Sequence, residues 1–352
     1  MKTIKNYNIY IFLSTLTRNI IDIYSVIYLY QKNIFLKDII FIYIIVYFLG
    51  TYISKISITL GNTLGYKYIL ILSSIMTSIS FYIIHKSNNL YLIAIFISLS
   101  MFTYHPIKHY YGIKLLKQKK QIGYTLIFTY IASLLSSYLA IHKIKILYLF
   151  IISIISIIPA LLIKKDSTKR IIYQKKIPSN KILFFIFDQF KIIFILLEPL
   201  YLYTISNNIS YVGIFNIILT LASMISIYIL SNKINIEKNY KYINILFTIV
   251  LILKLNMRNK TLLLALAFLE GIGIKSNELV STINLYSNNE LTEGYIIESE
   301  TIFCLTRTII LSIIYLFPLN LNIILHILLI GIFILSFQYK KNTLIWVSYQ
   351  YF

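Results

Sequence analysis

The chain consists almost entirely of long apolar runs separated by short polar segments. A helix needs about 20 mostly apolar residues to cross a bilayer, and dividing the sequence at its charged and Asn/Gly clusters gives twelve such runs. The predicted spans cover residues 9–30, 37–59, 67–84, 90–110, 122–142, 146–163, 182–204, 209–231, 241–257, 261–284, 295–317 and 320–338. They leave no room for a soluble domain, so we expect an all-helical membrane protein.

Composition excludes the soluble classes of protein. Apolar residues make up 58% of the chain and charged residues 13%, with a mean hydropathy of +0.78, whereas soluble domains carry about 25% charge. The single cysteine, Cys304, can form neither an internal disulfide nor a thiolate metal cluster. No glycine-rich phosphate loop is present. We therefore expect no cofactor, no ATP hydrolysis and no enzymatic activity.

The positions of the cations predict the topology. Cytoplasmic loops collect Lys and Arg, and 21 of the 33 basic residues fall on the side of the predicted spans that holds the N-terminus. Both termini are therefore predicted to be cytoplasmic, and a cell membrane is the expected location. The net charge of +21 is explained by topology, so nucleic acid is not an expected partner.

The longest and most basic connection divides the chain into two halves. Residues 164–181 hold seven Lys and Arg side chains and follow the sixth predicted span. Shifting the sequence by 173 residues superposes the first two spans of each half without a gap, and it brings Arg18 onto Lys191. Such duplication is common in transporters. The expected organisation is a bundle at 1–163, a linker at 164–181, a second bundle at 182–338 and a cytoplasmic tail at 339–352.

The expected loop between spans two and three carries a partial motif. It runs from Ile58 to Lys67 and reads ITLGNTLGYK. In the major facilitator superfamily this loop has Gly, three residues, Asp, two residues, Gly and then basic residues. Gly65 and Lys67 match the second glycine and a following cation, while Ile58 and Asn62 replace the first glycine and the acid.

With twelve spans and a basic central loop, the chain thus resembles this superfamily of secondary transporters. The resemblance implies two six-helix bundles, a monomer, and a gating loop that contains Gly65 and Lys67. It also implies that spans one, four, seven and ten line a central cavity, with help from two, five, eight and eleven.

Charged residues follow the same division into central and peripheral spans. A charge at mid-membrane costs about 2.5–3.5 kcal/mol on insertion scales, so it persists mainly where it faces a cavity or a partner. Spans three, six and twelve hold no Asp, Glu, Lys or Arg in their interiors, and span nine holds only Lys254 near its outer end. The predicted solute and proton cavity contains Arg18, Asp22, His105, Asp188, Lys191, Glu270, Lys275, Glu278, Glu300 and Arg307.

Helical spacing predicts how these charges pair. Arg18 with Asp22, Asp188 with Lys191, and Lys275 with Glu278 are four or three residues apart and can form ion pairs. By contrast, Glu300 and Arg307 are separated by about 10 Å along one helix. Their partners are expected on another helix or in the solute. The alternative is that these residues are static pairs that hold helices together, or charges that snorkel to an interface.

His105 and His109 are four residues apart, a spacing that two ligands of one metal ion can share. No acidic residue or cysteine lies beside them in the sequence, so we do not predict a metal site. Packing around Pro106 is the preferred interpretation, with a cavity role for His105 as the alternative.

These observations favour a secondary transporter that moves a small solute by alternating access. The ionisable set is nearly neutral in sum, which favours a polar, zwitterionic or amphiphilic solute. Asp22 and Glu270 are the candidates for a carboxylate that takes and releases a proton. A multispan membrane enzyme, such as a lipid-linked transferase, and a noncatalytic subunit of a membrane complex are the alternatives.

Overall fold

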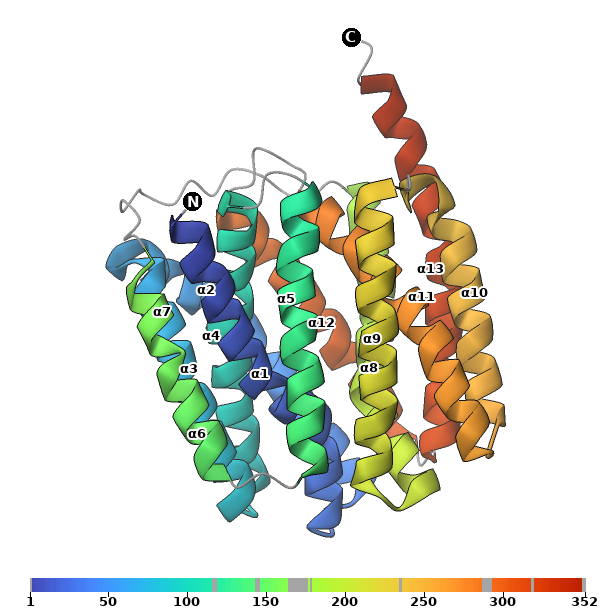
Figure 1. The fold of residues 1–352 in the computed structure, drawn as a ribbon, viewed down its shortest axis with the longest axis horizontal. Coiled ribbons are helices and arrows are strands. Elements are labelled where there is room, and N and C mark those ends of the chain that lie inside the picture. Colours follow the sequence, from blue (N-terminus) through green and yellow to red (C-terminus); the bar gives the residue numbers. More distant parts are fainter. Residues whose placement is uncertain are drawn as a thin grey trace.

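A computed structural model describes residues 2–115, 119–142, 146–163, 177, 179–233, 236–286, 293–317 and 320–349. Regular structure in these ranges is helical throughout, and the helices lie side by side, roughly parallel or antiparallel (Figure 1). The chain begins and α13 ends at the same end of the bundle (Figure 1). We call this the terminal end, and the other the opposite end.

Seven helical segments build the first half. Their bounds are α1 Lys2–Gln31, α2 Leu36–Leu64, α3 Tyr66–Lys86, α4 Leu90–Leu115, α5 Lys119–Ile141, α6 Ile146–Ile155 and α7 Ile157–Leu161. The last two segments together form the sixth predicted span. Pro159 explains why α6 stops at Ile155, because proline has no N–H to donate to the carbonyl four residues earlier.

Six helices build the second half. Their bounds are α8 Ser179–Ser206, α9 Ile209–Lys233, α10 Ile236–Asn256, α11 Lys260–Tyr286, α12 Glu293–Leu316 and α13 Leu321–Tyr349. Each predicted span thus has its helix, and most helices continue a few residues beyond the apolar run that predicted them. The largest difference is at α13, which continues eleven residues past the predicted end at 338 into the expected tail.

The expected loop between spans two and three is almost absent. Residues 58–64 belong to α2, and α3 begins at Tyr66. Only Gly65 separates the helices, with a positive φ of 112° that side-chain-bearing residues rarely adopt. The side chain of Lys67 lies over the ring of Tyr68, 5.1 Å from its centroid.

The two halves meet through a few pairs of helices. In the described residues α5 packs along α9, α2 packs along α12, and α1 contacts α8. The helices α3, α6 and α7 pack mainly within the first half, and α10 and α13 within the second. This division agrees with the predicted split between central and peripheral spans.

Outward-facing side chains show that the surface is apolar. Five helices, α2, α3, α4, α9 and α12, contain a described stretch long and apolar enough to cross a membrane, and parts of α5, α6–α7 and α13 form shorter apolar stretches. Large apolar side chains on these helices are exposed, for example Ile158, Leu316 and Ile330. A surface of this kind requires lipid, so the protein is an integral membrane protein.

Close packing of α9 against α11 depends on small residues. A Cβ at Gly271 would collide with the backbone oxygen of Leu219 and lie 3.0 Å from the Cβ of Ala222. Ser223 donates its hydroxyl to the carbonyls of Leu219 at 2.6 Å and Gly271 at 3.1 Å. Small residues let helix backbones approach closely in lipid, where van der Waals contact supplies much of the association energy.

We expect Gly271→Val to force α9 and α11 apart and to destabilise the protein by about 1–3 kcal/mol. Thermal unfolding of the purified protein in detergent measures the effect. The control is Leu269→Ala on the same helix, which removes atoms from a side chain that is exposed. Equal unfolding temperatures for the glycine variant and the wild type would contradict the packing argument.

Candidate functional site

Arg18 lies inside the first half, against α3 and α4. Its guanidinium donates to backbone or hydroxyl oxygens of Ser73, Thr77 and Ser100, and lies 4.1 Å from the ring centroid of Tyr104. The side chain is buried. A cluster of small hydroxyl residues thus solvates this cation.

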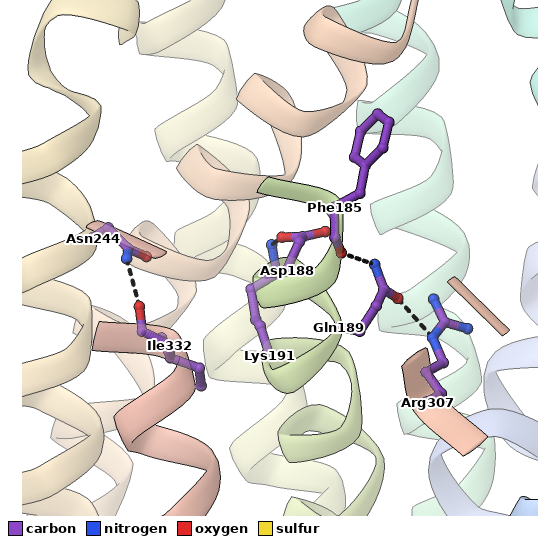
Figure 2. Close-up of polar contacts among 7 residues, drawn as sticks. All are labelled: Phe185, Asp188, Gln189, Lys191, Asn244, Arg307 and Ile332. Atoms are coloured by element: carbon purple, nitrogen blue, oxygen red, sulfur yellow. Dashed lines mark hydrogen bonds and ion pairs between the residues drawn. The ribbon is translucent and has the colours of Figure 1, made fainter. Parts of the chain in front are cut away.

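Asp188 and Lys191 form the ion pair that their spacing predicted, and both are buried in the second half. Figure 2 shows the pair on the side of α8 away from Gln189. Glu198 follows Lys191 by seven residues, two helical turns, and so lies on the same side of α8. The interior of the second half is therefore ionic over much of the length of this helix.

Glu198 belongs to a buried cluster of three charged residues, which we call the acid–lysine triad. Lys254 of α10 donates to both carboxylate oxygens of Glu270 on α11, at 2.8 and 2.7 Å, and also to Glu198 on α8. Lys254 and Glu270 are fully buried, and Glu198 is 5% exposed. The ammonium group also lies 5.0 Å from the ring centroid of Phe194 and 5.5 Å from that of Phe215.

The triad holds two carboxyl groups and one ammonium group. With all three ionised it carries one net negative charge in a buried setting. One added proton makes it neutral. Charge neutrality is strongly favoured in a low dielectric, so one added proton would lower the electrostatic cost of burying the triad.

Arg307 lies on α12 where the two halves meet. Its Nε donates to Oε1 of Gln189 on α8 at 2.7 Å (Figure 2). Its guanidinium lies 5.0 Å from the ring centroid of Tyr47 on α2. Gln189 is itself held, because its amide nitrogen donates to the carbonyl of Phe185 at 2.9 Å and its side chain is buried. Arg307 is thus positioned by one residue from each half.

Glu300 also links the halves, closer to the terminal end. Its carboxylate lies 3.4 Å from Nε2 of His109 on α4. Glu300 is buried, whereas His109 is partly exposed. Glu300 and Arg307 therefore find different partners on other helices, as their separation predicted. His105 packs on the neighbouring aromatic residues Tyr104 and Phe102, with centroid distances of 5.3 and 6.5 Å.

Contacts between the halves also occur near the opposite end. Gln31 of α1 donates to the hydroxyl of Tyr203 on α8 at 3.1 Å. On the α2–α12 contact, the rings of Phe41 and Tyr315 are 5.8 Å apart, and Lys37 lies 4.8 Å from the centroid of Tyr315. Arg307 therefore lies between two sets of contacts that join the halves, one toward each end.

Three members of the predicted cavity set lie outside the described side chains. The backbones of α1 and α11 are described at Asp22, Lys275 and Glu278, but the side chains of these residues are not. The remaining residues separate into three places. Arg18 lies within the first half, Asp188, Lys191 and Glu270 lie within the second half, and His105, Glu300 and Arg307 lie on α4 and α12.

Sequence reasoning missed the role of Lys254. Its position two residues before the end of α10 placed it among the outer cations, on a span expected to be peripheral. The side chain instead extends into the second half. The sequence did offer one signal. Glu198 and Glu270 have no cation three or four residues away on their own spans, so a cation from another span was needed to pair with them.

We expect Lys254→Met to destabilise the protein by about 3–5 kcal/mol, because it leaves two buried carboxyl groups without their cation. The variant Glu198→Gln/Lys254→Met/Glu270→Gln should recover most of this loss, since it removes all three charges. Thermal unfolding in detergent checks both, and Lys260→Met, at an exposed lysine, is the control. Wild-type stability in the single variant would refute the assigned role.

Comparisons with known proteins identify the fold. No family model matches the sequence, and no curated protein matches it. Solved structures do match over nearly the whole chain. The nucleoside transporter NupG is 10% identical with a TM-score of 0.66, and the match covers 96% of this chain and 99% of that one.

Two further structures give the same result. The human organic anion transporter MFSD10 is 9% identical, with a TM-score of 0.67 and coverage of 96% and 99%. A bacterial homologue of the iron transporter ferroportin, in an outward-facing state, is 11% identical with a TM-score of 0.63 and coverage of 97% and 99%. The protein is thus an integral membrane protein that shares the fold of these solved transporter structures.

Proposed function

We propose that the protein is a secondary transporter that moves a small solute across the membrane by alternating access. The observation that carries this proposal is the position of Arg307, an ionic side chain held between the two halves of a transporter fold. The matched structures are transporters by title, which favours transport over a membrane enzyme or a noncatalytic subunit.

The contacts between the halves suit a rocking motion. Alternating access opens one end of the molecule while the other stays closed. Opening the terminal end would separate His109 from Glu300, and opening the opposite end would separate Gln31 from Tyr203. Each of these contacts is small and polar, so its loss is compatible with exchange between two states.

We favour a proton gradient as the energy source for transport. Glu270 remains a candidate carrier because the triad becomes neutral on binding one proton, and Asp22 on α1 is the other candidate. A transporter that gains a proton and a solute on one side can release both on the other when the buried group is exposed to each side in turn.

The cation distribution supports a placement with both termini in the cytoplasm of a cell-membrane protein. We take the monomer as the working unit. The terminal end then faces the cytoplasm, and His109 with Glu300 forms the contact nearer to it.

The test begins with thermal stabilisation of the purified protein across a library of metabolites, which selects a solute. Uptake of that solute into proteoliposomes is then driven by an inward proton gradient. We expect Glu270→Gln or Asp22→Asn to abolish acceleration by the gradient while solute exchange continues at equal pH, because exchange needs no net proton release.

Asp38→Asn, at a carboxyl group near the start of α2 and outside both clusters, should retain gradient-driven uptake. Full gradient-driven uptake in both Asp22→Asn and Glu270→Gln would exclude these residues as proton carriers. Absence of transport for every stabilising solute would overturn the transport proposal itself.

A further inference from the structure

The charges available to a solute differ from those that the sequence suggested. Asp188 pairs with Lys191 and Glu270 pairs with Lys254 inside the second half, and Arg18 lies inside the first half. Glu300 and Arg307 lie instead on α12, where the two halves meet. The summed charge of the whole set therefore does not describe the junction between the halves, where the immediate surroundings of Arg307 matter.

Arg307 differs from the other described cations of the second half's interior. Lys191 is paired with Asp188, and Lys254 is paired with Glu198 and Glu270. Among the described residues, Arg307 has an amide oxygen on Nε and an aromatic face beside it, with no carboxylate within ion-pair distance. Its two terminal nitrogens make no hydrogen bond to any described residue.

A guanidinium group without a carboxylate partner is energetically costly at this depth in the membrane. Arg307 lies about 21 Å along α12 from the start of the helix and about 13 Å from its end, which is near the middle of the membrane. The cost of a charge there is about 2.5–3.5 kcal/mol. Glu300 does not form an ion pair with it, because Glu300 is two turns away and contacts His109.

The orientation of Arg307 is fixed from both halves. Gln189 holds Nε from α8, and Tyr47 packs on the guanidinium from α2. The edge of the guanidinium group opposite Nε therefore presents its two terminal nitrogens in a fixed plane. This arrangement matches the two oxygens of a carboxylate or phosphate group, which guanidinium binds through paired hydrogen bonds.

We propose that Arg307 binds the anionic group of the solute, so that the protein transports a small organic anion with a carboxylate or phosphate group. This inference rests on the proposed transport function. Gln189 is a positioning residue in it, since it acts by orienting Arg307. The anion supplies the charge partner that the described protein residues do not, and a solute-bound state is thereby stabilised relative to the empty one.

The test uses the wild-type protein and therefore does not depend on a variant that folds. The purified protein is treated with phenylglyoxal, which modifies arginine, and modification of each arginine is followed by peptide mass spectrometry. The probes are a panel of small carboxylates and inorganic phosphate, each compared with a neutral amide or alcohol of similar size. Arg258, which is exposed beyond the end of α10, is the internal control.

We expect at least one anion to slow modification of Arg307 by about tenfold at saturation, with no effect on Arg258 and none from its neutral counterpart. Arg307→Gln should weaken the stabilisation by that anion by about tenfold or more, as for the loss of a charge-assisted hydrogen bond. Gln189→Leu should weaken it less. Protection by carboxylates or by phosphate alone identifies which group is recognised.

Modification of Arg307 at the same rate with every anion would overturn the inference. So would transport of a neutral or cationic solute that Arg307→Gln leaves unchanged, and that result would leave the transport function intact. Failure of the proposed function has a different signature, namely the absence of transport for any solute that stabilises the protein.

Discussion

The high cost of placing charge in a lipid bilayer determines how this molecule is built. Its surface is apolar around the helices, so each ionisable side chain in a span must be solvated by protein. The structure does this in three ways. Hydroxyl groups surround Arg18, carboxylates surround Lys254 and Lys191, and a buried amide with an aromatic face holds Arg307. Of these three settings, only that of Arg307 lies at the junction between the two halves and lacks a carboxylate partner among the described residues.

Much of the fold could be predicted from the sequence, because lipid imposes a length on each span. Twelve apolar runs gave twelve spans, and the pairing of Asp188 with Lys191 followed from helical spacing alone. Helix ends were less predictable. Polar residues end the apolar run but not the helix, since backbone hydrogen bonding continues into the interface, as α13 shows by extending to Tyr349.

The candidate site was less accessible to sequence reasoning, because the relevant contacts join residues far apart in the chain. Lys254 was placed outside by its position near the end of α10, but a flexible four-carbon stem can carry an ammonium group deep into the protein. The role of Gln189 could not be predicted for a different reason. An amide in an apolar run carries no charge to mark it, and only the contact with Arg307 reveals what it does.

The two halves share a plan but differ in their interiors. Arg18 and Lys191 occupy equivalent positions under the 173-residue shift, and both are buried within their own half. The first half solvates its arginine with neutral hydroxyl groups, whereas the second concentrates carboxylates and lysines on α8, α10 and α11. Under the proposed proton coupling, a proton bound by the triad would change the charge inside the second half. If the solute is an anion at Arg307, its charge and that of a proton in the triad cancel, and their joint movement carries no net charge across the membrane.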